Sequence, residues 1–164
     1  MDKNYIVIGI GGKTKIQRWD IEKYADVLNK CSINLKIIIL GGKDEIDDAD
    51  KLNKLSKKQI INLCGKTNIL ESAYILSKAK IYFGNDTGTL HLASIVGTKC
   101  LVISSARNNI GRWDPYGNNH TIIRTRIDCE GCWLHADNCK KNIQCMTDIQ
   151  VSTVVDSLKK SLND

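Results

Sequence analysis

The stretch GNDTGTLH, residues 84–91, gathers polar side chains and glycines between two apolar runs of the chain. It follows KIYFG, which has the pattern of a buried strand, and it leads into LHLASIVG, which has the pattern of a short helix. Amides and the dipole at a helix N-terminus attract anions, and Gly88 leaves the backbone open to a ligand. Thr87 adds a hydroxyl, and His91 lies one helical turn further on. The stretch therefore predicts an anion site.

Asp86 would repel a phosphate placed directly over it. We expect it instead to accept hydrogen bonds from loop amides or from a neutral hydroxyl. The alternative for the stretch is structural: Asn85, Asp86 and Thr87 would cap the helix, and His91 would be a satisfied, half-buried side chain. A lone Asp-Thr-Gly also occurs in aspartic proteases, but there it needs a β-rich fold and a second copy, which this sequence lacks.

A second group of chemically active side chains lies near the end of the chain. Four cysteines follow one another in C-x2-C-x6-C-x5-C spacing around His135: Cys129, Cys132, Cys139 and Cys145. Four soft ligands in so short a segment could close a structural zinc site, and the first pair has the usual spacing for one. Disulfides, or thiols packed beneath the last helix, are the alternatives. The remaining cysteines are expected to be small buried side chains: Cys31, Cys64 and Cys100.

Short β-branched runs alternate with helical patterns along most of the chain. The expected strands are NYIVIGI, LKIIIL, QIINLCG, KIYFG, KCLVIS and HTIIRTR. The expected helices cover residues 20–31, 48–55, 68–79 and 90–97, with Asp20 and Asn68 as N-caps of the first and third. Nearly continuous apolar strands are typical of a parallel sheet covered on both faces. The fold class is therefore α/β: a Rossmann-like, doubly wound parallel sheet that binds ligands beyond the carboxyl ends of its strands.

The pattern changes after this alternation. Residues 128–147 have little aliphatic periodicity, and residues 148–162 then form a closing helix. We divide the chain into a Rossmann-like domain, residues 1–127, and a Cys-rich segment with a closing helix, residues 128–164, packed on the same domain.

Composition narrows the class of protein. Of the 164 residues, 42% are hydrophobic and 26% are charged, which is typical of a globular domain. The chain has neither a signal-peptide pattern at its start nor an apolar run long enough to span a membrane, so we expect a cytoplasmic protein. The net charge of +6 suits an anionic ligand or membrane surface. No stacking pattern of aromatic and basic residues is present, so we expect no nucleic-acid partner, and a zinc-containing nucleic-acid-binding domain is only a rival interpretation.

The segment YFGNDTGTLHLASIVGTKCLVISSARNNIGRWDPYG, residues 82–117, resembles the signature region of glycosyltransferase family 9. These are the heptosyltransferases that build the inner core of lipopolysaccharide, and the segment belongs to their C-terminal nucleotide-sugar-binding domain. VIGIGGKTKIQRWDIEKYADVL, IIILGGKDE and LCGKTNILESAYILSKAKIYFGNDTG resemble other segments of that domain in the same order. The resemblance thus covers nearly the whole chain.

The resemblance implies one half of a GT-B fold, in which two Rossmann-like domains face each other across a cleft. It implies inverting, metal-independent transfer of a sugar from an ADP-heptose-like nucleotide-diphosphate sugar to a lipopolysaccharide-type acceptor at the cytoplasmic face of the inner membrane. No cofactor would be required. The catalytic base would come from an N-terminal partner domain or chain and is unknown in this sequence. The alternative is a non-catalytic module that binds a nucleotide or nucleotide sugar.

The resemblance also implies a set of donor-binding residues: Asp86, Thr87, Gly88, His91, Lys15, Arg18, Glu45 and Thr67. The amides of Thr87 and Gly88 would bind phosphate. An acid, Asp44 or Glu45, would lie near the ribose, and Thr67 near the adenine.

This sequence departs from the family in having Gln17 where a lysine usually neutralises the diphosphate. The candidate replacements are Lys13, Lys15 and Arg18. The segment GRWDPYG, residues 111–117, is expected in a loop on the same side as residues 84–91, where Arg112 could reach a sugar or phosphate. Three tryptophans are expected to pack in the core or at a rim: Trp19, Trp113 and Trp133.

Overall fold

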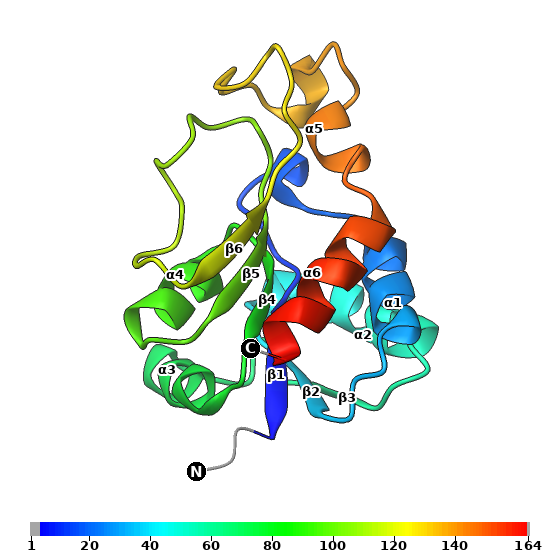
Figure 1. Cartoon of the computed structure of the whole chain (residues 1–164), viewed down its shortest axis with the longest axis vertical. Helices are drawn as coiled ribbons and strands as arrows, with labels where there is room; N and C mark the ends of the chain where they lie inside the picture. Colours follow the sequence, from blue (N-terminus) through cyan, green and yellow to red (C-terminus); the bar gives the residue numbers. More distant parts are fainter. Residues whose placement is uncertain (1–3, 164) are drawn as a thin grey trace.

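All six expected strands are present, and they form one fully parallel sheet (Figure 1). The structure is a computed structural model that describes residues 4–163. The strands are β1 (Tyr5–Gly9), β2 (Lys36–Ile39), β3 (Ile60–Asn62), β4 (Tyr82–Asn85), β5 (Cys100–Ile103) and β6 (His120–Ile123). Their order in the sheet is β3-β2-β1-β4-β5-β6, which is the Rossmann order, so the predicted fold class is confirmed.

Helices cover both faces of the sheet (Figure 1). On one face lie α1 (Ile21–Lys30), α2 (Ile46–Leu55) and α6 (Val151–Asn163), and on the other lie α3 (Ile69–Lys78) and α4 (Gly88–Ile95). Shorter helical turns are η1 (Lys15–Gln17), η2 (Lys43–Glu45), η3 (Ala136–Asn138) and α5 (Gln144–Thr147). The central strands are buried from both sides, which is why their sequences are almost continuously apolar.

The two predicted helix caps have different outcomes. Asn68 caps α3 as expected: its side-chain oxygen accepts hydrogen bonds from the amides of Leu70 and Glu71, at 2.9 and 3.0 Å. Asp20 occupies the N-cap position of α1, as predicted, but its exposed side chain makes no capping hydrogen bond. The start of α1 is held instead through the preceding residue, because the amide of Trp19 donates to the Asn85 side chain at 3.3 Å.

Two helices begin earlier than the sequence pattern predicts. Helix α4 begins at Gly88 because the hydroxyl of Thr87 accepts hydrogen bonds from the first-turn amides. Helix α2 begins at Ile46 because the turn η2 leads directly into it. Both differences bring a helix N-terminus closer to the carboxyl end of a strand, which is where ligands bind in this fold.

The chain after β6 leaves the sheet and then returns to it. The segment with α5 lies at the end of the molecule opposite the start of β1, and α6 runs back along α1 (Figure 1). Cys145, Met146 and Ile149 belong to the same buried cluster as residues of β1 and β2. The domain boundary at residues 127/128 stays a prediction. Among the described residues, no helix has the length and apolar character that a membrane crossing requires.

Candidate functional site

A cavity of about 840 Å³ lies at the carboxyl ends of the strands. It opens beside β1 and β4, the two central strands at which the strand order reverses direction, and this is where open α/β sheets bind ligands. The residues that line it fall within 11–18, 40–45, 86–91, 107–113 and 133–135. Four of these five segments directly follow a strand, namely β1, β2, β4 and β5.

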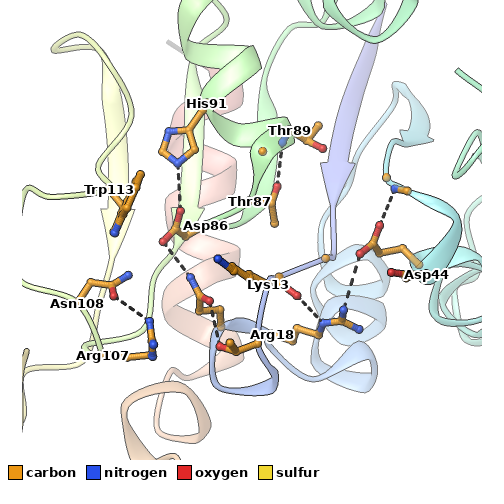
Figure 2. A pocket seen from close by; sticks show the side chains of 18 of the residues that line it. Lys13, Arg18, Asp44, Asp86, Thr87, Thr89, His91, Arg107, Asn108 and Trp113 are labelled. Carbon is orange, nitrogen blue, oxygen red and sulfur yellow. Dashed lines mark hydrogen bonds and ion pairs between the residues drawn. The ribbon is translucent and has the colours of Figure 1, made fainter. Parts of the chain in front are cut away.

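The N-terminus of α4 contributes an open backbone to this cavity. Thr87 caps the helix, and its hydroxyl oxygen lies 3.2 Å from the amide nitrogen of Thr89 (Figure 2). Gly88 is exposed, and a side chain built there would meet nothing within 4 Å. An anion can therefore approach the first turn of α4 closely, where the helix dipole favours negative charge.

Asp86 and His91 form a pair beside this helix end. Nε2 of His91 lies 3.3 Å from Oδ1 of Asp86, and Nε2 of Gln17 donates to Oδ2 of Asp86 at 3.4 Å (Figure 2). The Asp86 side chain is only 11% exposed. Its two oxygens thus contact side chains and not loop amides, which was one of the two expectations; the other, a hydrogen bond from a neutral hydroxyl, stays a prediction. Asp86 orients the imidazole of His91, whose ring also meets the ring of Trp113 with centroids 6.0 Å apart.

Asn85 has a structural role that the sequence analysis missed. It is completely buried, and its Nδ2 donates to the carbonyls of Ile10 and Gly11 at 2.7 and 3.0 Å. Its Oδ1 accepts from the hydroxyl of Tyr24 at 2.8 Å and from the amide of Trp19. Asn85 therefore ties the loop after β1 to β4 and α1, so it does not cap α4. A polar residue at the end of the buried run KIYFG was the available signal.

Burial keeps the hydroxyls around Asn85 neutral. It raises the pKa of Tyr24 and that of Tyr82 well above their ordinary values. The Tyr82 hydroxyl donates to the carbonyl of Asn85 at 3.0 Å and lies 3.4 Å from the hydroxyl of Thr87. Hydrogen bonds from neutral hydroxyls in the core thus hold the end of β4 in place, and this positions Asp86 and Thr87 at the cavity.

Two acids, Asp44 and Glu45, lie in the cavity wall that follows β2, and the prediction that one of them binds a ribose stays a prediction. Glu45 is engaged twice: Oε2 accepts from the amide of Gly42 at 2.5 Å, and Oε1 lies 3.8 Å from Nη2 of Arg18. Asp44 also lines the cavity, and among the described residues its carboxylate has no partner. Asp44 is therefore the freer of the two to accept hydrogen bonds from ligand hydroxyls.

Two cationic side chains of the loop after β1 line the cavity, and they differ in whether other residues bind them. Lys13 lines the cavity, and within residues 4–163 its side chain makes no hydrogen bond or ion pair (Figure 2). Arg18 also lines it, but its guanidinium lies near Glu45, lies 3.6 Å from Asp48 and donates to the carbonyl of Gly12 at 3.0 Å. Lys13 is thus the cation most available to a ligand.

Two predicted donor-binding residues do not reach the cavity. Lys15 begins the turn η1 and lines a separate pocket beside Trp19. Thr67 follows the edge strand β3, and its hydroxyl lies 2.8 Å from that of Ser72 on α3. The remaining six predicted residues line the cavity together: Asp86, Thr87, Gly88, His91, Arg18 and Glu45. That these six bind a donor stays a prediction.

The far wall of the cavity comes from residues that the sequence analysis mostly missed. Arg107, Asn108 and Trp113 lie on one side of Asp86, and Asp44 lies on the other (Figure 2). The Cys-rich segment completes this wall with Trp133 and His135. Trp113 and Trp133 are rim residues, as predicted, and are 47% and 40% exposed. Arg107 and Asn108 were not singled out, although they lie within residues 82–117, the segment that resembles the family signature.

The Cys-rich segment does not assemble a metal site in this structure. Within residues 4–163, no three side chains of His, Cys, Asp or Glu come close enough together to hold a metal ion. Every cysteine of the chain is a free thiol, so the disulfide alternative is not realised. Cys145 packs in the core beneath α6, whereas Cys129, Cys132 and Cys139 are partly exposed. A structural zinc stays a prediction.

The geometry suits a ligand with both phosphate and hydroxyl groups. The helix end at Gly88 and the ammonium group of Lys13 favour negative charge, and Asp44 can accept hydrogen bonds from hydroxyls across the cavity. Both requirements are met within one open cavity between two walls.

Comparisons with known proteins agree with this picture. The family model of glycosyltransferase family 9 (heptosyltransferase) matches residues 1–143. The chain is 28% identical over 172 residues to the lipopolysaccharide core heptosyltransferase OpsX of Haemophilus influenzae. The matched region covers 96% of this chain and 48% of that protein.

Two solved structures show the same fold. The ADP-heptose lipopolysaccharide heptosyltransferase II of Escherichia coli matches with a TM-score of 0.80 at 18% identity, over 98% of this chain and 47% of that chain. The iron-containing dodecameric glycosyltransferase TibC of enterotoxigenic E. coli matches with a TM-score of 0.67 at 15% identity, over 99% and 46%. The chain spans about half the length of these relatives.

Proposed function

The chain belongs to glycosyltransferase family 9, and from this premise we propose that it is the donor half of a heptosyltransferase with a GT-B fold. Its cavity would bind an ADP-heptose-like nucleotide-diphosphate sugar for transfer to a lipopolysaccharide-type acceptor. Support comes from the matched family, from the relative that acts on the lipopolysaccharide core, and from the ADP-heptose in the name of a structural neighbour.

One observation carries the proposal: the open N-terminus of α4 and the free carboxylate of Asp44 line the same cavity on either side of β1. The diphosphate would lie against Thr87 and Gly88, where backbone amides and the helix dipole favour it. The ribose hydroxyls would reach Asp44. A nucleotide bound in this way directs its sugar toward the wall of Arg107 and Trp113.

Lys13 replaces the lysine that the family has at the position of Gln17. Gln17 is neutral and hydrogen-bonded to Asp86, and Arg18 is engaged by two acids, so neither offers an unpaired charge. Lys13 has a free ammonium group in the cavity. It would neutralise the negative charge that develops on the departing nucleoside diphosphate, which is a role for electrostatic stabilisation.

The complete reaction would need a second domain or chain. Inverting transfer requires the acceptor hydroxyl and a base in line with the sugar carbon, and this chain is about half the length of its relatives. We propose that the base and the acceptor site come from that partner and that no metal is required. EDTA should leave the rate of the complete enzyme unchanged, and a metal-dependent rate would contradict this part of the proposal.

The acceptor proposed here is a lipid, so the protein would act at the cytoplasmic face of the inner membrane. Its net charge of +6 would favour an anionic surface. Co-sedimentation with vesicles that contain phosphatidylglycerol, but not with neutral vesicles, would support this location.

The first experiment is a calorimetric titration of the chain with ADP, UDP and GDP. We expect ADP to bind and Lys13→Ala to weaken its binding about tenfold, because a charge-assisted contact to phosphate is lost. Lys15→Ala is the matched control, since the same residue type two positions away lies outside the cavity, and it should bind ADP like the unaltered chain.

A variant at the helix end tests the site independently of charge. Gly88→Val places a branched side chain where the phosphate would approach, and we expect it to abolish ADP binding while the fold stays intact. Equal ADP binding by the Lys13 and Gly88 variants and the unaltered chain would refute the proposed donor site.

A further inference from the structure

Two guanidinium groups without acidic partners lie in the loop after β5. Arg107 lines the far wall of the cavity, whereas Arg112 is exposed and is not one of the residues that line it. In the described part of the chain, neither Arg107 nor Arg112 has a carboxylate within salt-bridge distance, whereas Arg18 and Arg124 each pair with acids. Arg107 donates only to neutral oxygens: to the carbonyls of Leu134 and Trp133 and to the side chain of Asn108, at 2.6, 3.2 and 3.1 Å. Its positive charge is fixed in place but not neutralised.

Both guanidinium groups are gathered around one aromatic ring. The guanidinium carbon of Arg112 lies 4.9 Å from the ring centroid of Trp133, and that of Arg107 lies 5.7 Å from it. The π-face attracts cations, so the ring holds together two like charges that would otherwise repel each other. The result is a concentrated positive charge beside an exposed tryptophan.

Trp133 is held in an unfavourable backbone conformation to make this arrangement. Its φ is 56°, in the left-handed region that bulky residues rarely adopt. Its amide donates to the carbonyl of Arg107 at 3.0 Å, and its Nε1 donates to Asn109 at 2.9 Å. Strain that the surroundings impose in this way is typical of ligand sites.

From these observations we propose a second subsite, formed by Arg107, Arg112 and Trp133, that binds an acidic saccharide. The aromatic ring would pack against the apolar face of a sugar, and the guanidinium groups would pair with its phosphate or carboxylate group. That the sugar is the acceptor rests on the function proposed above, which places the nucleotide of the donor against the opposite wall and directs its sugar toward this one. The cluster itself rests only on the geometry of this wall.

The subsite lies apart from the place proposed for the nucleotide. Arg107 is on the side of Asp86 opposite Asp44 (Figure 2). It comes from the loop after β5, whereas the phosphate site lies at the N-terminus of α4. An acidic sugar and a nucleotide should therefore bind together without competing.

The indole N–H signals of the three tryptophans in a ¹⁵N-labelled sample test the proposal. Trp113→Phe and Trp133→Phe assign the signals, and the buried Trp19 serves as an internal reference. Glucose 6-phosphate and glucuronate are the acidic probes, distinguishing phosphate from carboxylate, and glucose and inorganic phosphate are the controls. We expect at least one acidic sugar to shift the Trp133 signal at a concentration about tenfold below that needed for either control.

Two variants separate binding from structure. Within residues 4–163 the Arg112 side chain makes no hydrogen bond, so Arg112→Gln should weaken the acidic sugar several-fold and leave the hydrogen bond from Trp133 Nε1 to Asn109 in place. The change that loss of the guanidinium causes in the Trp133 signal of the free protein is recorded before the titration. Arg107→Gln should weaken it about tenfold, because a paired charge is lost. Its free-protein spectrum reports whether the wall stays in place.

Three results would overturn the subsite. These are binding of glucose as tight as that of the acidic sugars, binding of inorganic phosphate alone as tight as theirs, and displacement of the acidic sugars by saturating ADP. In the first two cases the wall recognises no acidic sugar, and in the third it belongs to the nucleotide site. Loss of ADP binding in the Lys13 or Gly88 variant, with the Trp133 response retained, would separate the two proposals.

Discussion

The two walls of the cavity are built in different ways. The sheet wall, residues 11–18, 40–45 and 86–91, rests directly on strands that are buried on both faces. The loop wall, residues 107–113 and 133–135, lies further from the sheet, because its first segment begins four residues after β5 and its second belongs to the Cys-rich segment. Its exposed tryptophans are held by hydrogen bonds between two irregular segments, such as those from the amide of Gly131 to the carbonyl of Ala106 and from Trp133 to Arg107.

This difference suits two different tasks. Side chains on the sheet wall are placed by close packing, so their positions change little, and a common group such as a nucleotide diphosphate can be held there. The loop wall is placed by exposed polar contacts, which tolerate sequence change more easily. A fixed wall for the donor and an adaptable wall for a second sugar would let related proteins share one carrier and differ in the partner sugar.

The largest expected effect comes from the support beneath the sheet wall. A side chain at Gly84 would overlap the carbonyl oxygen of Gly9 on the neighbouring strand, and backbone cannot move aside there. We expect Gly84→Ala to lower the free energy of unfolding by about 4 kcal/mol or more. Gly88→Ala, with open space around it, should change it by less than about 0.5 kcal/mol. Urea unfolding measures both, and similar losses would mean that the strands do not hold this wall rigidly.

The next largest effect is expected when the stability lost on removing one asparagine from each wall is compared. Asn85→Ala leaves the carbonyls of Ile10 and Gly11 and the hydroxyl of Tyr24 buried without their partner, and we expect a loss of about 3 kcal/mol. Asn109→Ala removes a single exposed bond to Trp133 and should cost about 0.5 kcal/mol. Thermal or urea unfolding of the two variants measures both losses of stability. A costly Asn109 variant would show that the loop wall is as tightly coupled to the core as the sheet wall.

The mildest test changes no residue. Burial raises the pKa of Cys64 and of Cys100 to about 12, so at pH 8 almost none of either thiol is in the reactive thiolate form. In the folded protein we expect iodoacetamide at pH 8 to modify the partly exposed thiols of Cys129, Cys132 and Cys139 first. Peptide mass spectrometry measures the order of labelling.

The same shifts give the pH dependence its sign. Unfolded thiols ionise near their ordinary pKa of 9.0, and folded ones near 12, so stability contributed by Cys64 and Cys100 is present below pH 9 and falls as the pH rises from 9 toward 12. Labelling of Cys64 or Cys100 as fast as that of Cys129 would contradict the contrast between core and segment.

Much of the sheet wall could be predicted from the sequence. The apolar strands, Gly88 and the cap residue Thr87 are local signals, because a strand end followed by a helix start has a recognisable composition. The sequence could not show that Lys13, and not Lys15, lines the cavity, because two lysines on one loop differ only in the direction that the folded turn gives them. The ion pair between Arg18 and Glu45 could not be predicted either, because the two residues follow different strands, β1 and β2, and meet only in the folded structure.

The sequence by itself determined the α/β class, the parallel strands and the position of the anion-binding helix end, because these depend on periodicity and on residues adjacent in the chain. Only the tertiary structure decided which side chains share the cavity. It brought Arg107 and Arg112 to Trp133 across twenty or more intervening positions, and it placed Asn85 in the core, where its side chain bonds to the loop after β1 and to Tyr24. Such contacts depend on how irregular loops fold back over the sheet, and the hydrogen bonds that fix them leave no periodic pattern in the chain.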